Sequence, residues 1–216
     1  MLKRSKNHFE QELPAFSFVR RAREKLGQYQ GSVEMQFKIN EKVVYPAHGV
    51  AVVEDVIEKT VGGNRLHFYK LSFLYKDMTI LIPVNNCEQT GVRGLSSVKE
   101  IDNALSVFNE KVLQQRFSEV DVSPSAWNKR HKDYQNRMQS GDFSGVLAIY
   151  QELMYMAQHK DLSFGEKSLL HTTEELLGQE LMVTKNIDRS ASLECLRAPF
   201  KQFVINYAPA QNQTNL

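Results

Sequence analysis

The chain has little of several features that would point to a function. It carries 2 cysteines, Cys87 and Cys195, in 216 residues, which is too few for a disulfide framework or a zinc site and fits a reducing compartment. Positive and negative charges nearly cancel at a formal +2, so overall charge does not indicate a nucleic-acid binder. No apolar run approaches the length of a membrane span, and the basic start at 1–6 leads into no signal-peptide core. We therefore expect a cytoplasmic protein without membrane contact.

Motifs for catalysis and cofactor binding are also missing. The sequence has no phosphate-binding loop with P-loop spacing and no Gly-x-Ser-x-Gly elbow. Its 6 histidines are scattered, and none pairs with a second ligand at metal-site spacing. His171 lies near acids, as a solvated surface residue often does, and Cys87 has no assignable base. We expect no enzyme, no catalytic residue, no metal and no cofactor.

Both ends of the chain read as weakly ordered. Residues 1–34 are polar and net positive, with too few apolar side chains for a core, so we expect a loosely ordered extension. Met35 opens a sequence that looks like a protein start, so an upstream start codon is an alternative origin for this extension. Residues 187–216 are expected to be a largely disordered tail, with room for one short helix around 191–196.

Short β-rich runs fill residues 37–83. Gly62-Gly63-Asn64 is a hairpin signal, and Pro83 ends the last run. The turns between these runs are too short for crossover helices, so the strands should pair antiparallel. Four or five short strands within about fifty residues predict a small antiparallel barrel.

After Gly94 the spacing of apolar residues becomes that of an α-helix. Ser97 with Glu100, and Ser163 with Glu166, read as capping boxes at two helix starts. Apolar stripes at helical spacing follow each of them and also run between them. The sequence therefore predicts an α+β protein, with a β domain at 35–95 and an all-α domain at 96–186.

The only tryptophan, Trp127, stands directly before a cluster of cations. From 127 to 139 there are four basic residues against the single acid Asp133, and Pro124 and Gly141 mark a helix start and stop. A flat apolar ring beside cations can wedge into a groove while the cations hold phosphates. A core tryptophan beside a solvated charged face explains the same residues and is the commoner arrangement. The exposure of Trp127 separates the two interpretations.

Six segments resemble, in order and spacing, the CarD/CdnL family of bacterial transcription regulators. Each segment alone is a weak match, but six in register from about 35 to 183 are specific. The first holds Val43-Val44-Tyr45-Pro46-Ala47-His48-Gly49-Val50. The others are Ile82-Pro83-Val84-Asn85-Asn86, Gly91-Val92-Arg93, Trp127-Asn128-Lys129-Arg130-His131-Lys132, Ser140-Gly141-Asp142 and Leu162-Ser163-Phe164-Gly165-Glu166-Lys167.

The resemblance implies that the helical domain touches promoter DNA. The tryptophan matching Trp127 wedges into the minor groove at the upstream edge of the transcription bubble, with low sequence specificity. Basic residues matching Lys129, Arg130 and Lys132 support it on the DNA backbone.

The resemblance also implies a Tudor-like barrel that binds the β subunit of RNA polymerase through an edge strand and basic residues. Lys59 keeps a positive charge at one such position, whereas Leu81 stands where an arginine is often found. The extension at 1–34 and the tail after Asn186 lie outside the family pattern.

Two functional hypotheses follow. The first is a monomeric, non-enzymatic factor that stabilises the open promoter complex, with the barrel as a tether that compensates for modest DNA affinity. The second is a partner-binding barrel joined to a helical scaffold or dimerisation domain that makes no DNA contact. An isolated polymerase-binding module of the repair-coupling translocase is disfavoured because the motor's nucleotide motifs are absent, and an enzyme of unfamiliar type comes last.

Overall fold

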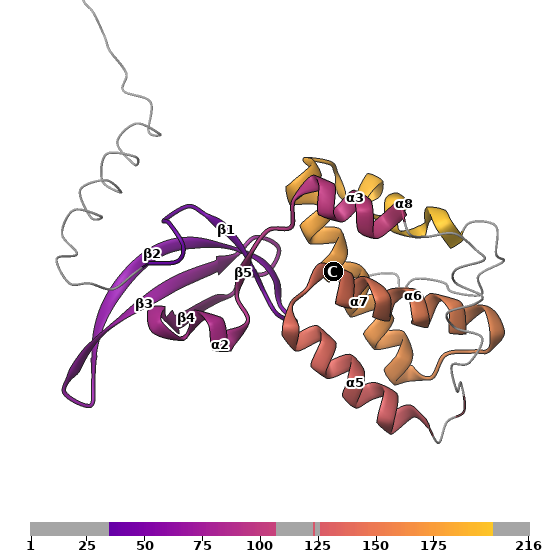
Figure 1. Ribbon diagram of the computed structural model, residues 1–216, viewed down its shortest axis with the longest axis horizontal. Helices are drawn as coiled ribbons and strands as arrows, with labels where there is room; N and C mark the ends of the chain where they lie inside the picture. Colours follow the sequence, from indigo (N-terminus) through magenta and orange to yellow (C-terminus); the bar gives the residue numbers. More distant parts are fainter. Residues whose placement is uncertain (1–34, 107–122, 124–125, 201–216) are drawn as a thin grey trace, which may run out of the picture.

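The computed structural model describes residues 35–106, 123 and 126–200. A twisted sheet forms one half of the molecule and a group of helices forms the other (Figure 1). The strands are β1 Lys42–Tyr45, β2 Gly49–Val61, β3 Asn64–Phe73, β4 Thr79–Pro83 and β5 Arg93–Gly94, with the short helices η1 Val84–Asn86 and α2 Cys87–Thr90 between the last two. The extension expected at 1–34 lies outside the described residues.

The sheet is antiparallel and open. Its strand order is β4-β3-β2-β1-β5, and the β2–β3 hairpin turns at Gly62 and Gly63, as predicted. The expected barrel is not formed, because β4 and β5 stand at opposite edges and do not pair. With only two residues, β5 is too short to curl round to β4 and close the sheet. The α+β class is confirmed, and closure of the barrel is corrected to an open five-stranded sheet.

One face of the sheet covers its own apolar core. The buried side chains come from alternate strand positions, as the period of two requires, and from the segments before β1 and after β4. Tyr69 is fully buried, and its hydroxyl accepts a hydrogen bond of 3.0 Å from the Phe37 N–H. The core residues are Phe37, Val43, Ala51, Val53, Val56, Tyr69, Leu71, Phe73, Ile82, Val84, Cys87 and Val92.

Five longer helices make the second half. They are α3 Val98–Ser106, α5 Trp127–Ser140, α6 Phe143–His159, α7 Phe164–Lys185 and α8 Arg189–Arg197, followed by the short helix η3 Ala198–Phe200. Both predicted capping boxes form: the Ser97 hydroxyl accepts from the Glu100 N–H at 3.2 Å, and Ser163 with Glu166 caps α7. Of the apolar stripe expected at Val98, Ile101, Leu105 and Phe108, Ile101 is buried whereas Val98 is 46% exposed. Phe108 lies outside the described residues.

The helices enclose a second core, separate from that of the sheet. It is built mainly from α6 and α7, with Ile101, Tyr134 and Met138 added from α3 and α5. Leu196 and Phe200 are also buried in it. The short helix expected around 191–196 is therefore present as α8, and it packs on the helical core together with η3. The Asp188 side chain caps α8 by accepting from the Ala191 N–H at 2.7 Å. No helix among the described residues is long and apolar enough to cross a membrane.

Candidate functional site

Helix α5 carries the tryptophan and the predicted cations. It begins at Trp127 without a side-chain cap and ends at Gly141, whose φ of 69° is the left-handed conformation that favours glycine at a helix end. Tyr134 and Met138 anchor the inner side of α5 in the helical core. The Tyr134 hydroxyl donates a 2.5 Å hydrogen bond to Glu152 on α6. Figure 1 shows that the first turn of α5 is the end of this helix that lies farther from the sheet.

Trp127 is partly buried. It is therefore neither fully exposed, as a wedge would be, nor fully enclosed, as a core tryptophan would be. Its ring stacks on His131 with centroids 4.9 Å apart, and it packs against the helical core. A Cβ added to Gly165 would stand 3.1 Å from the Trp127 Cζ2, so the glycine permits this close approach. The indole is thus seated on the start of α7 while part of its surface reaches solvent.

The predicted cations of α5 divide into two groups. Lys129 and Lys132 are exposed, so their ammonium groups can meet a phosphate without rearrangement. The Arg130 side chain is only 10% exposed, and its guanidinium lies 3.1 Å from the Glu166 carboxylate. A second hydrogen bond of 3.3 Å runs from Arg130 to the Ser123 carbonyl oxygen. Contact of Arg130 with DNA stays a prediction, and the structure gives this residue an internal partner.

Glu166 joins the start of α7 to both α5 and the preceding loop. Its carboxylate accepts hydrogen bonds from Lys160 at 2.9 and 3.1 Å and from the Ser163 N–H at 2.9 Å. Burial acts to raise the pKa of Glu166, but the bonds from Ser163 and Lys160 outweigh it and hold the pKa below its ordinary value. Glu166 is therefore a buried carboxylate that stays charged and holds Arg130 in place.

Phe164 is a candidate that sequence reasoning missed. It is the first residue of α7 and is 90% exposed, the highest value among the exposed large apolar residues of the described chain. The next residue, Gly165, is the one against which Trp127 packs, so the start of α5 lies against the start of α7. The available signal was its phase: Phe164 lies outside the inward stripe that continues at Leu170, Thr173 and Leu177.

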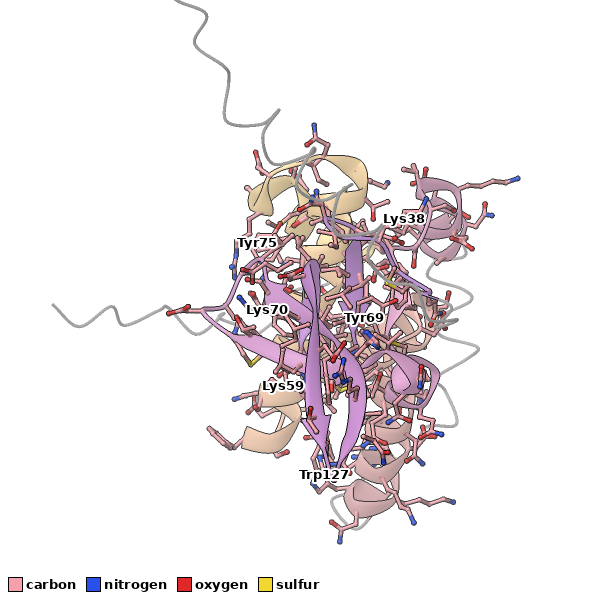
Figure 2. All side chains as sticks on the ribbon, turned by 90° about the vertical axis from the view of Figure 1, so that its left-hand side faces the viewer. Lys38, Lys59, Tyr69, Lys70, Tyr75 and Trp127 are labelled. Carbon is pink, nitrogen blue, oxygen red and sulfur yellow. The ribbon has the colours of Figure 1, made fainter. Side chains whose placement is uncertain are left out.

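The two predicted polymerase contacts share one face of the sheet. Lys59 on β2 pairs with Leu66, and Leu81 on β4 pairs with Lys70. Leu66 and Lys70 are four residues apart on β3, so all four side chains point to the face opposite Tyr69. Figure 2, viewed from the sheet side, shows Lys59 and Lys70 on the sheet and Trp127 at the lower end of the molecule.

Leu81 lies on an edge strand. Among the described residues, β4 pairs with β3 alone, so its outer edge offers backbone N–H and C=O groups to a further strand. Lys70, beside Leu81, is paired with Glu54 at 2.9 Å, whereas Lys59 is exposed. The face around Leu81 thus combines a strand edge, partly buried apolar side chains and lysine charge.

The remaining candidates are a metal site and the thiol of Cys87. The described residues contain no group of three or more His, Cys, Asp or Glu side chains that could hold a metal ion. Cys87 is buried, and burial raises the pKa of its thiol to about 11. At neutral pH the thiol is protonated, which makes it a poor nucleophile.

Comparisons with known proteins agree with this two-part architecture. Residues 37–96 match the family model of the CarD-like/TRCF RID domain, and residues 110–197 match that of the CarD C-terminal domain. The chain is 26% identical over 152 residues to the Bacillus subtilis (strain 168) protein named "Putative transcription factor YdeB", which covers 70% of this chain and 94% of that relative. These matches point to a transcription factor rather than an enzyme. The chain belongs to the CarD family, with the RNA polymerase-interacting domain followed by the CarD C-terminal domain.

Proposed function

We propose that this protein stabilises open promoter complexes by linking RNA polymerase to the upstream edge of the transcription bubble. The sheet docks on the β subunit, and the start of α5 and α7 meets the DNA. The observation that carries the proposal is the partly exposed Trp127 at the start of α5, on a helix that also presents the exposed Lys129 and Lys132. The exposed Phe164 stands next to Gly165, against which Trp127 packs. A ring that inserts at a base step costs about a few kcal/mol of unstacking, and this cost is smallest where the duplex is already opening.

The lysines supply the sequence-independent part of the contact. Phosphate contacts from Lys129 and Lys132 position the protein on the duplex without reading its sequence. Two exposed cations give little affinity on their own, which agrees with the formal net charge of only +2. Attachment to polymerase raises the local concentration of these aromatic and basic side chains at the promoter, so weak contacts suffice.

The proposed docking on the β subunit rests on the sheet. An extended segment of a partner can add to the open edge of β4 through main-chain hydrogen bonds, while side chains on the Leu81 face select the partner. Lys59 lies on that same face, two strands away from the edge. The protein needs no second copy for either contact, so we propose that a monomer acts.

Measured lifetimes of heparin-challenged promoter complexes test the proposal. Phe164→Ala removes a ring that is 90% exposed, so it should shorten the lifetime without weakening the fold or polymerase binding. Trp127→Ala should shorten it as well. The matched control is Val98→Ala, which trims an apolar side chain that is 46% exposed on α3. Unchanged lifetimes with both aromatic variants would overturn the proposal.

One observation favours the alternative, a scaffold without DNA contact. Trp127 packs partly into the helical core, as a structural tryptophan does. The scaffold hypothesis requires Trp127→Ala to act only through stability and Phe164→Ala to have no effect at all. A lifetime that falls for Phe164→Ala at unchanged thermal stability therefore separates the two functions.

A further inference from the structure

The two halves of the molecule meet in a tightly fitted joint. Pro46, from the turn between β1 and β2, lies against Gly91 and against Gly141 at the end of α5. A Cβ on either glycine would stand 3.0 Å from the Pro46 Cγ. Gly49, with φ of 102°, lies so close to Gln179 on α7 that an added Cβ would be 2.0 Å from the Gln179 Oε1. Larger residues at these glycines would push the halves apart.

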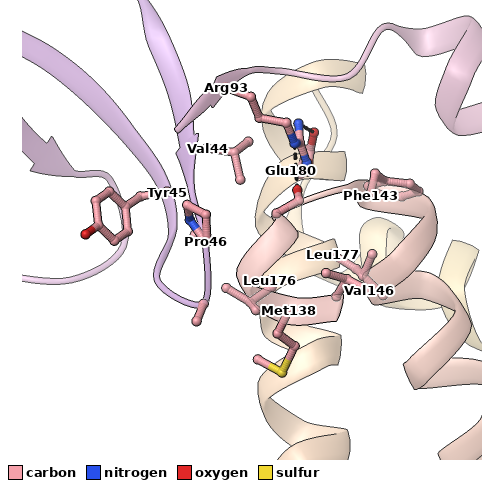
Figure 3. A pocket seen from close by; sticks show the side chains of 13 residues that line it. Val44, Tyr45, Pro46, Arg93, Met138, Phe143, Val146, Leu176, Leu177 and Glu180 are labelled. Atoms are coloured by element: carbon pink, nitrogen blue, oxygen red, sulfur yellow. Dashed lines mark hydrogen bonds and ion pairs between the residues drawn. The ribbon is translucent and has the colours of Figure 1, made fainter. Parts of the chain in front are cut away.

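Arg93 is the polar centre of this joint. It sits on β5, paired with Val44 of β1, and its guanidinium binds Glu180 of α7 with two hydrogen bonds, of 2.8 and 2.9 Å. Its Nε donates at 2.6 Å to the carbonyl oxygen of Gly141. Figure 3 shows the Arg93–Glu180 pair between the sheet and the helices. One side chain thus connects the sheet, the end of α5 and the C-terminal part of α7.

Two further contacts fix the same interface. The Ser96 N–H donates to Glu180 at 2.9 Å, and the Val50 N–H of β2 donates to the Gln179 Oε1 at 3.3 Å. The Glu180 side chain is 5% exposed and that of Arg93 25%, so the carboxylate is buried and its arginine partner is partly buried. The cavity beside the pair leaves about 20 Å³ of free space, room for about one water molecule. The joint is therefore filled by the protein and is no ligand pocket.

The polar residues of the joint lie outside both apolar cores. The sheet and the helices bury separate clusters of apolar residues, and Arg93 and Glu180 belong to neither. A buried ion pair is a weak source of stability, because the loss of hydration offsets much of the attraction between the charges. The paired groups instead fix one relative orientation of the sheet and the helices, because the planar guanidinium of arginine donates to several acceptors in fixed directions.

We infer that Arg93 and Glu180 are positioning residues that fix the angle between the sheet and α5. They thereby set where Trp127 and Phe164 stand when the sheet is docked; this consequence rests on the proposed function, whereas the fixed angle does not. With 14 residues and a rise of about 1.5 Å per residue, α5 places Trp127 roughly 20 Å from Gly141, so a tilt of about 10° would move the ring by roughly 3–4 Å. A displacement of that size exceeds a hydrogen-bond length and would take the ring off its base step.

The angle is tested by distance measurement between two spin labels on the full-length chain. One label is placed at Thr60→Cys on β2 and the other at Gln135→Cys on α5, both exposed positions, with Cys195→Ser removing the accessible native thiol. Glu180→Gln keeps shape and removes the charge, and Arg93→Lys keeps the charge and removes the fork. Each should widen the distance distribution at unchanged helicity. The control is Glu175→Gln, on the same helix as Glu180, which removes the ion pair with Arg189 of α8 and should leave the distance distribution narrow.

Open-complex lifetimes with the same substitutions, unlabelled, form the second arm. We expect Glu180→Gln and Arg93→Lys to shorten the lifetime as Trp127→Ala does, while polymerase affinity stays at the wild-type value. A distribution that stays narrow in both variants would overturn the inference, as would a widened distribution with wild-type lifetimes while Trp127→Ala shortens them. If Trp127→Ala and Phe164→Ala leave the lifetime unchanged, the proposed function is wrong. The spin-label distances still test whether Arg93 and Glu180 fix the angle between the sheet and α5.

Discussion

Trp127 and Phe164 have different structural roles, although each is the first residue of its helix, α5 and α7. Trp127 packs on His131 and Gly165, so its removal leaves a partial void. Phe164 is almost fully exposed to solvent, and substitutions at such surface sites usually change the free energy of unfolding by no more than about 0.5 kcal/mol. Of the two residues, Phe164 is therefore the cleaner probe of function, because its loss leaves the helical core intact.

We predict that Trp127→Ala lowers the melting temperature clearly more than Phe164→Ala. A partly buried indole should cost less than the roughly 3–5 kcal/mol of a core aromatic, yet more than the exposed ring. Differential scanning calorimetry of the two variants measures this. Equal melting temperatures would mean that the indole contributes no packing, contrary to its contact with Gly165.

The salt dependence of DNA binding distinguishes Arg130 from the two lysines. Each phosphate contact changes the slope of log K against log salt by about 0.9. Lys129→Gln and Lys132→Gln should each reduce the slope by about that amount, equally on all duplexes. Arg130→Gln should leave the slope unchanged, because its guanidinium is held by Glu166. A slope that falls by about one in Arg130→Gln would show instead that Arg130 leaves Glu166 and binds phosphate.

Leu81 offers a test by gain of function. An arginine is often found at this position in proteins that the chain resembles, and Leu81 lies on the open edge strand beside Lys70. If the partner surface is acidic, Leu81→Arg should tighten polymerase binding severalfold and Leu81→Glu should weaken it, because opposite charges attract across a desolvated interface. Pull-down of polymerase with the full-length variants measures this. Tighter binding by the glutamate variant would assign the opposite charge to the partner.

At the scale of elements, the start of α7 depends on one carboxylate. The pKa of Glu166 is lowered from 4.5, so its charged form stabilises the fold above the unfolded pKa, and this contribution is lost as pH falls through the lower folded pKa. Glu166→Gln should cost about 1–3 kcal/mol at neutral pH and should make the loss of stability below about pH 5 shallower. Urea unfolding across pH measures both effects, with Glu175→Gln on the same helix as control. An equally steep acid limb in Glu166→Gln would contradict the assignment.

The elements that local chemistry defines could be predicted from the sequence. Gly62-Gly63 fixes the hairpin, Ser163 with Glu166 starts α7, and Gly141 ends α5, because each depends on residues a few positions apart. Closure of the sheet could not be predicted in the same way. It depends on how far β5 reaches, and a strand of two residues leaves almost no pattern in the sequence.

The candidate site shows the same division. The sequence predicted Trp127 and its cations as one DNA-binding group, but it could not separate Lys129 from Arg130, since their difference is made by Glu166, 36 residues after Arg130. Phe164 was missed because its exposure depends on where α7 begins relative to α5. The residues Arg93 and Glu180 are 87 positions apart, and no local sequence pattern at either residue predicts that they pair.

At the scale of the whole molecule, the two proposed contacts lie at opposite ends. The hairpin of β2 and β3 extends to one side, and the start of α5 lies on the other (Figure 1). A chain built in this way bridges two surfaces, and each contact limits the complex differently. Under the proposed function, docking sets how often the aromatic side chains are present at the promoter, whereas these side chains set how long the open complex lasts.

This division predicts different responses to protein concentration. A flexible or rigid tether gives the second contact an effective concentration on the order of millimolar. A variant with weakened docking, such as Leu81→Glu, should therefore lose open-complex stabilisation at low concentration and recover it progressively as more protein is added. Phe164→Ala should saturate at the wild-type concentration but reach a shorter lifetime, because the docked protein lacks the ring. Lifetimes of heparin-challenged complexes across a titration of each variant measure both curves. If added protein restores Phe164→Ala to the wild-type lifetime, or never improves Leu81→Glu, then docking and stabilisation do not lie in separate halves of the molecule.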